Sequence, residues 1–541
     1  MRDTASEFAS CLSRRFAGAI TAAALAHDLG KLDWRFQLLL HDGDEVAASS
    51  GDPLAKSAEL PERRRKRRQV AEDARLPKGF RHEFLSMQLA DHFRLTPTDE
   101  EARELTLHLI ASHHGYARPF APVAPDSLVA AGLAGSLCLS RIGMDATLSA
   151  AERQALTPTY RLDSGVPDRF WRLTRRYGWW GLAYLEGIFR LADWEASRRP
   201  GAGMEAVPPM PSAPAQPRPA PRNPIALDAL DGANPLAFLA ALGTLRVLTR
   251  VLPQYDPRLS WEQRLGAWRP LLWTAIPVDE AMVCNALSEN GVDLSAMFSA
   301  EILSAGEAAG PRNKKGEASW KDKLLFPVKD FRHYCGTASR SPSVGGEFAA
   351  AWAGETAPKE MEGKDLARRT RFDFTAGPQR FVGMLRELRK SCTATDIRHA
   401  LFNGWHYSTA AASMRWDTQD EKRQYALQSV DPTNNSKNPP MADRGANFLA
   451  AEALPLFPLV PDRWAGQAGF GGKGEGRCWS WPIWAHPLSL DVIRSLLAFP
   501  FADSEEWSAA GRHEIGVPVI FQSRIVMPSG RYRCFTPPRS L

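Results

Sequence analysis

The hydrophobic positions in the first 200 residues are typical of helices. Residues 20–26 form an Ala-rich, helix-forming run. Residues 105–110 and 184–191 are apolar stretches suited to buried helices. We therefore predict a bundle of helices over residues 1–199.

A change in composition ends this pattern. Residues 200–225 are rich in proline and alanine, with little that could build a core. Such a stretch is typical of a semi-rigid, extended linker. The alternative is a Pro-rich ligand for a partner protein.

Mixed elements follow the linker. We expect Asn234 to cap a buried helix that has Pro235 at its first position and runs to Leu248. Residues 259–261 and 271–273 resemble short strands, and the Gly-rich residues 469–476 resemble turns or mobile loops. The predicted fold class is multidomain: an all-α helical bundle followed by a mixed α/β domain over residues 226–541.

The composition is that of an ordinary globular protein, with 44% hydrophobic and 24% charged residues among 541. The net charge of +6 is mild, so any nucleic-acid binding must come from local patches. The 7 cysteines are widely spaced, which argues against a disulfide framework or a structural zinc site. No signal peptide or long apolar run is evident, so we expect a cytoplasmic protein that does not contact membranes.

Histidines and aspartates recur through the helical part of the chain. The set is His27, Asp28, His82, His113, His114 and Asp193. Imidazole and carboxylate hold catalytic divalent metals, and two such ions suit the in-line cleavage of a phosphodiester. A lone buried histidine is more often a hydrogen-bonded core residue, but ligands this far apart suit a bundle whose facing helices share one site.

At these residues the chain resembles the HD nuclease of CRISPR type I interference, the nuclease half of a nuclease–helicase effector. The matching elements are residues 27–31, 36–37, 82–83, 113–115 and 192–193, together with Ser197. The doubled histidine makes the resemblance more specific than the minimal HD signature. It covers residues 1–200 and implies an all-α HD domain.

The resemblance also implies a role for each residue. Asp28 would bridge two metals, with His27 and Asp193 on one and His82, His113 and His114 on the other. Lys31 would neutralise phosphate charge near the scissile bond. The ions would be Mn²⁺, Ni²⁺, Fe²⁺ or Mg²⁺, although His-rich ligation leans away from Mg²⁺. Successive helical residues point about 100° apart, so we expect a helix end at His113 and His114, which Gly115 favours.

One feature departs from the family pattern. A further metal-binding histidine normally lies before the HD pair, but no histidine precedes His27 here. We expect either a start further upstream or a copy that lacks this ligand, and favour the former.

A run of six cations lies between two ligand-bearing segments. It comprises Arg63, Arg64, Arg65, Lys66, Arg67 and Arg68. A solvated loop is the simpler interpretation. The alternative is a rim that holds DNA phosphates on the path to the metals, with Ser197 as a further contact.

The C-terminal region resembles, more loosely, the large subunit of a CRISPR type I surveillance complex of the I-G (I-U) kind. The stretches that carry this likeness are residues 231–243, 444–458 and 481–490. They imply contact with the subunits of a crRNA-guided complex. Basic residues near aromatics, such as residues 368–372, suit nucleic-acid binding or simply cover a core as charged loops. The chain has no Gly-Lys-Ser/Thr phosphate loop, so we expect a separate CRISPR helicase to unwind the DNA.

Three functions fit these observations. The first is a metal-dependent, single-stranded DNA nuclease of antiviral defence, fused to a domain that binds DNA or the surveillance complex. The second is an HD phosphohydrolase of nucleotides or cyclic nucleotides. The third is a degenerate HD scaffold without activity.

Overall fold

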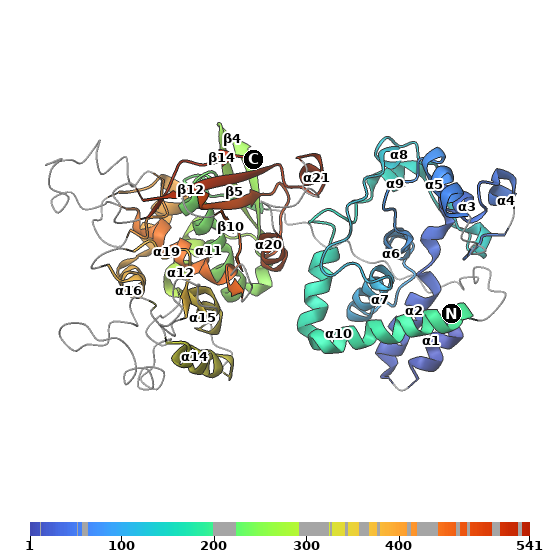
Figure 1. Cartoon of the computed structure of the whole chain (residues 1–541), viewed down its shortest axis with the longest axis horizontal. Coiled ribbons are helices and arrows are strands. Elements are labelled where there is room, and N and C mark those ends of the chain that lie inside the picture. Colours follow the sequence, from blue (N-terminus) through green and yellow to red (C-terminus); the bar gives the residue numbers. More distant parts are fainter. Residues whose placement is uncertain are drawn as a thin grey trace. The chain divides into compact units, whose positions relative to one another are not determined.

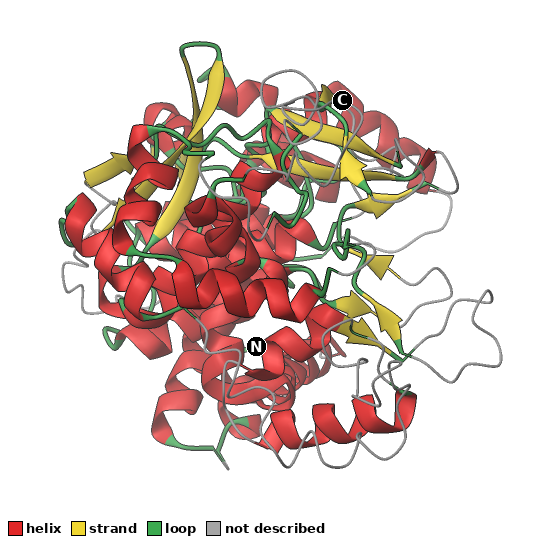
Figure 2. Ribbon diagram, turned by 90° about the vertical axis from the view of Figure 1, so that its left-hand side faces the viewer, coloured by secondary structure: helices red, strands yellow, loops and turns green. Residues whose placement is uncertain are grey.

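The chain forms two compact units, Met1–Arg218 and Pro219–Leu541. The computed structural model describes residues 1–10, 12–50, 52–56, 63–198, 223–291, 324, 327–340, 345–355, 367–375, 379–407, 413–418, 442–460, 466–472, 476–499, 509–527 and 533–541. The first unit is mainly helical, and the second combines helices with small sheets (Figure 1). Figure 2 distinguishes the helices from the strands by colour. The protein is therefore multidomain, with a helical N-terminal part. None of the described helices has the length and apolar character needed to cross a bilayer.

The first unit is built from short helices and one long one. Its helical elements are α1 (Arg2–Phe8), α2 (Arg14–Ala26), η1 (Leu29–Leu32), α3 (Trp34–Leu40), α4 (Glu45–Ser50), α5 (Arg63–Asp73), α6 (His82–His92), α7 (Glu100–Ser112), α8 (Ser127–Ala130), η2 (Ser140–Ile142), α9 (Ala150–Ala155) and α10 (Val166–Arg198). The expectation of an all-α unit needs one correction, because β1 (Leu137–Cys138) and β2 (Thr147–Leu148) form a two-stranded antiparallel sheet.

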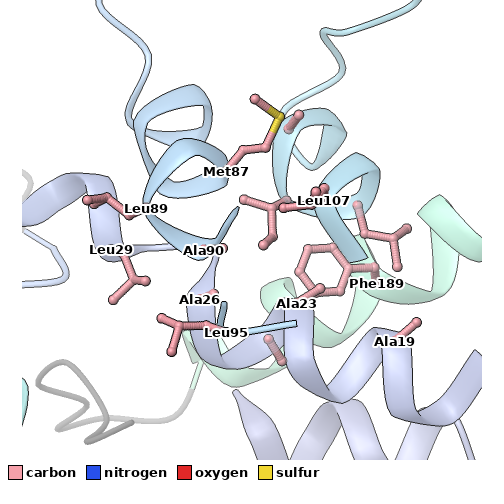
Figure 3. Packing of buried hydrophobic residues seen from close by; sticks show 14 of the residues in the cluster. Ala19, Ala23, Ala26, Leu29, Met87, Leu89, Ala90, Leu95, Leu107 and Phe189 are labelled. Carbon is pink, nitrogen blue, oxygen red and sulfur yellow. The ribbon is translucent and has the colours of Figure 1, made fainter. Parts of the chain in front are cut away.

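Small residues let the helices of this unit approach closely. One face of α2 is lined by alanines, and the Thr106 hydroxyl on α7 donates to the Ala19 carbonyl of α2 at 3.2 Å. Figure 3 shows side chains of α2, α6, α7 and α10, including Met87, Leu107 and Phe189, gathered in one core. This core holds the ends of α2 and α7 near each other.

The long helix α10 lies along α1, α2 and α7 and bends at Gly178, which has φ +71° and ψ 167° (Figure 1). The prediction of a helix over residues 184–191 is confirmed, but its burial is one-sided. Leu185 and Phe189 are buried, whereas Tyr184 is 59% and Leu191 55% exposed.

The basic run is also helical. Residues 63–68 form the beginning of α5, so the solvated-loop interpretation is wrong. Consecutive cations with strong helix propensity can extend a helix when their charges stay at the surface.

The second unit begins within the stretch that the sequence assigned to a linker. Residues 223–226 form strand β3 (Asn223–Ala226), while residues 199–222 lie outside the described residues. The other strands are β4 (Arg258–Arg264), β5 (Ala267–Thr274), β6 (Ala353–Gly354), β7 (Arg368–Arg369), β8 (Leu459–Val460), β9 (Gly466–Gln467), β10 (Phe470–Gly471), β11 (Cys478–Ile483), β12 (Val519–Val526), β13 (Cys534–Phe535) and β14 (Arg539–Ser540). The helical elements are α11 (Pro235–Val251), η3 (Pro253–Tyr255), α12 (Glu280–Glu289), α14 (Val328–Arg340), α15 (Gly345–Trp352), α16 (Phe381–Ser391), α17 (Ala394–Arg398), η6 (His399–Asn403), α19 (Arg444–Glu452), η7 (Leu454–Leu456), α20 (Leu490–Leu497) and α21 (Ala509–Glu514).

Two antiparallel sheets dominate this unit. One has the order β3-β5-β4, and the other has the order β10-β11-β12-β13, with β14 also paired to β12. The predicted strands at residues 259–261 and 271–273 are confirmed within β4 and β5. The Gly-rich stretch 469–476 is not all turn, because Phe470 and Gly471 form β10.

The predicted buried helix is confirmed as α11. The Asn234 side chain accepts from the Leu236 amide at 2.9 Å, and Pro235 occupies the first turn. Aromatic residues join this helix to both sheets: Phe238 stacks on Trp261 of β4 at 5.7 Å and meets Trp481 of β11 at 6.0 Å.

Candidate metal centre

The HD pair lies where α2 ends. His27 follows the last residue of α2, and its Nδ1 lies 2.9 Å from the Ala24 carbonyl oxygen. A carbonyl oxygen can only accept, so Nδ1 donates and the neutral ring keeps its lone pair on Nε2. The helix end thus aims Nε2 of His27 toward Asp28 and Asp193.

A close contact sets the turn after His27 against α6. A Cβ at Gly30 would lie 2.1 Å from the carbonyl oxygen of His82, and the Gly30 amide donates to the Ser86 hydroxyl at 2.8 Å. Only glycine leaves room for this approach. It brings His82, the first residue of α6, next to Asp28.

The doubled histidine lies at the end of α7, as the sequence predicts. The helix ends at Ser112, and Gly115 has φ +91°. Nδ1 of His113 donates to the Ile110 carbonyl at 2.7 Å, which again leaves Nε2 free. His113 and His114 then both turn toward His82, and ligand atoms of the three rings lie within 4.8 Å of one another.

Asp28 lies between two groups of candidate ligands. Its Oδ2 is 3.5 Å from Nε2 of His27, which is itself 3.5 Å from Oδ1 of Asp193 on α10. Its Oδ1 is 3.3 Å from Nε2 of His82. The structure thus brings together all six residues that the sequence singled out.

Lys31 completes the cluster. Its Nζ lies 2.8 Å from Oδ1 of Asp28 and donates to the Ala55 carbonyl at 2.9 Å. Its side chain is 13% exposed, so the ammonium is held at the edge of the site.

The pKa values of His113 and His114 are lowered, as suits metal ligands. Burial, followed by the charge of His27, lowers the pKa of His113 well below its usual range. Burial, followed by the charge of His82, lowers the pKa of His114 to about 4. Both rings are therefore neutral at pH 7, the form in which imidazole binds metals.

Around Asp28, the neighbouring charges outweigh the effect of burial on the pKa values. Burial would lower the pKa of His27, but Asp28 and Asp193 outweigh it and raise that pKa. Burial would raise the pKa of Asp28, yet His27 and His82 hold it well below its usual range. The carboxylate is therefore ionised and able to bind cations.

The residues present fit a divalent metal. Nε2 of His82 is buried and faces Oδ1 of Asp28 at 3.3 Å without forming a well-directed hydrogen bond with any described residue, an arrangement that costs free energy unless a ligand satisfies it. His27, His82 and His113 are all at least nine-tenths buried. Imidazole nitrogens with two carboxylates are a donor set for transition metals.

Sequence reasoning gave no role to Glu83. This residue is fully buried, and its Oε2 lies 3.7 Å from Nδ1 of His82. Its adjacency to His82 in the sequence was the available signal, but only the fold shows that it is buried.

A buried ion-pair network that begins two residues after Lys31 was also missed. Arg35 is completely buried and donates to Asp33 at 2.9 Å and to Asp126 at 2.7 Å. Arg153 donates to the same Asp33 carboxylate. This network fixes the start of α3 directly after the turn that carries Asp28 and Lys31.

The predicted DNA contacts differ in their environments. Arg67 lies 3.7 Å from Asp42, and Arg68 pairs with Glu72 at 3.0 Å. Ser197 is exposed on α10, and its carbonyl accepts from Lys56 at 3.2 Å. The side chains of residues 63–66 lie outside the described ones.

The helical bundle thus brings four histidines and two aspartates together, the residue types expected of an HD-type metal centre. Residues 1–200 match the family model described as "Cas3, HD domain". This segment is therefore of the Cas3 HD type, a CRISPR-associated, metal-dependent hydrolase of the nuclease class. No curated protein matches the chain.

Proposed function

We propose that the first unit is a single-stranded DNA nuclease of CRISPR antiviral defence that works with two divalent ions. The observation that carries this proposal is the position of the Asp28 carboxylate. Its two oxygens lie 3.5 Å from His27 and 3.3 Å from His82, which belong to different ligand groups. A carboxylate that faces both groups is what two metals sharing a bridge require.

In this proposal each ligand group holds one ion. The first comprises His27 and Asp193, the second comprises His82, His113 and His114, and Asp28 serves both. The hydrogen bonds from His27 and His113 to helix-end carbonyls support the proposal, because they fix ring orientation before an ion arrives. Mn²⁺, Ni²⁺ and Fe²⁺ suit this His-rich set better than Mg²⁺.

Divalent ions bound here would activate the attacking water and stabilise charge on the leaving oxygen. The protein's own residues position the substrate. Lys31, anchored by Asp28 and the Ala55 carbonyl, presents its ammonium to the phosphate and offsets the charge that develops in the transition state. No side chain needs to form a covalent intermediate.

The remaining parts would serve the same task. Residues 63–68 and Ser197 would guide the strand by its phosphates. The second unit would bind DNA or subunits of a crRNA-guided surveillance complex in the cytoplasm, and a separate CRISPR helicase would supply the unwound strand. Contact with the surveillance complex rests on the looser, large-subunit-like resemblance of the C-terminal region.

The test is degradation of circular single-stranded DNA with Mn²⁺ by the native chain, Asp28→Ala and the control Asp73→Ala. Asp73 is an exposed aspartate of α5. We expect Asp28→Ala to lower the rate by at least about 100-fold, the scale of losing one electrostatic contact to a transition state. Asp73→Ala should match the native chain.

Other outcomes point to the alternatives. Hydrolysis of nucleotides or cyclic nucleotides, without cleavage of the circle, would favour a small-molecule phosphohydrolase. Absence of activity together with absence of bound metal would favour a scaffold.

A further inference from the structure

One end of the five-stranded sheet in the second unit collects positive charge. We call the residues concerned the arginine cluster: Arg368, Arg369, Arg371, Arg477 and Arg533. They come from three separate stretches of the chain, so no single run in the sequence identifies the cluster.

The register of the sheet brings two of them together. Cys478 of β11 pairs with Arg524 of β12, and Cys534 of β13 pairs with Val526 of the same strand. Arg477 and Arg533 directly precede Cys478 and Cys534, so both lie at the end of β12, one on each side. Since neighbouring strands are about 4.8 Å apart, β11 and β13 lie about 10 Å apart across β12.

Aromatic contacts hold the third stretch against this end of the sheet. The Phe372 ring lies 4.8 Å from that of Phe470 on β10, and the Phe374 ring lies 4.8 Å from that of Phe535 on β13. Arg371 is thereby placed with its guanidinium 5.7 Å from the centre of the Phe470 ring.

The arginines are close enough to repel one another. Burial, followed by the charges of Arg368 and Arg477, lowers the pKa of Arg371. Burial, followed by the charges of Arg477 and Arg369, lowers the pKa of Arg533. Asp373 pairs with Arg369 at 2.9 Å at the edge of this group.

We propose that the arginine cluster binds the phosphate backbone of a single-stranded nucleic acid, with a base against Phe470. Guanidinium groups bind phosphates through paired hydrogen bonds. An aromatic ring among cations is the usual platform for an unstacked base.

A cavity adjoins this platform. Its volume is about 630 Å³, and Phe470 lines it together with Gly469, Ser480 and Arg494. A base displaced from its stack at Phe470 therefore has space beside it. An extended duplex offers no free base to this space, so the site favours single strands.

The proposal is independent of the nuclease centre, because the site lies in the other unit and needs no metal. Binding is therefore measured with EDTA on the full chain carrying Asp28→Ala. The probe is a labelled oligothymidylate of about 20 nucleotides, long enough to span several phosphate contacts. Fluorescence anisotropy is recorded over a series of salt concentrations.

The test variant combines Arg371→Gln, Arg477→Gln and Arg533→Gln. The control removes the same charge elsewhere in the second unit, through Arg264→Gln, Lys329→Gln and Lys390→Gln. We expect the test variant to bind at least about tenfold more weakly, with a salt slope smaller by about 2, since each phosphate contact contributes about 0.7. The control should keep most of the affinity and slope.

A second variant guards against misfolding. Arg371→Lys, Arg477→Lys and Arg533→Lys retain the charge and should bind more tightly than the Gln variant. Equal losses in the test and control variants would overturn the proposal. So would unchanged binding in the Gln variant, or equal competition by polyglutamate, which would mark a general anion patch.

Discussion

At the scale of single residues, the histidines of the metal cluster are oriented by two different routes. His27 and His113 each follow the last residue of a helix and donate Nδ1 to a carbonyl three residues back. His82 instead begins α6 and has no helical turn behind it. The nearest anionic group that the structure records for its Nδ1 is the buried carboxylate of Glu83, at 3.7 Å.

This difference predicts the effect of Glu83→Gln. A carboxylate behind a metal-binding histidine fixes its tautomer and raises its basicity, and losing such a partner costs about 10- to 100-fold in metal affinity. We expect Mn²⁺ affinity, measured by calorimetry, to fall by that amount for one ion while the melting temperature changes little. The exposed Glu7→Gln should bind as the native chain does, and native affinity in Glu83→Gln would exclude this role.

The candidate ligands could be predicted from the sequence because each lies in a short, recognisable stretch. The residues that orient them could not. Ala24 and Ile110 orient His27 and His113 only through their backbone carbonyls. Glu83 lies beside His82 as a fully buried carboxylate. The position of a backbone carbonyl and the burial of a side chain depend on the folded structure, so the residue types alone do not reveal them.

At the scale of elements, the contact between η1 and α6 sets the spacing of the site. Gly30→Ala would put a methyl group 2.1 Å from the His82 carbonyl oxygen, so the two elements must separate. We expect a loss of about 1–3 kcal/mol in the free energy of unfolding, typical of overpacking, together with weaker metal binding.

Gly18→Ala in α2 is the matched control. No atom lies within 4 Å of the Cβ it would add, and its position is helical. It should leave stability unchanged or raise it by about 0.5–1 kcal/mol, because glycine costs that much relative to alanine in a helix. Denaturant unfolding measures both, and equal stability of the two variants would contradict the role given to Gly30.

The apolar patterns predicted where helices form better than they predicted which helix residues are buried. The stretch 184–191 is helical, but Tyr184 and Leu191 face outward, because one face of α10 suffices to cover the bundle. The run at residues 63–68 is helical rather than a loop, as the helix propensity of arginine and lysine favours. Capping at Asn234 was predictable because it depends on adjacent residues alone.

At the scale of the whole molecule, the sequence indicated a helical part and a mixed part, and both are present. The sheet order of the second unit was beyond prediction. β12 pairs with both β11 and β13, so Arg477 and Arg533, which are 56 residues apart in the sequence, lie at the same end of β12. The sequence shows such residues only as isolated cations.

We propose that the His/Asp cluster holds two ions, one on each side of Asp28. Anomalous X-ray scattering from crystals of the full chain grown with Mn²⁺ tests this directly. We expect two peaks about 3.5–4 Å apart, one beside His27 and Asp193 and one among His82, His113 and His114. A crystal with full Mn²⁺ access but no peak at these residues, or with peaks only elsewhere, would contradict it.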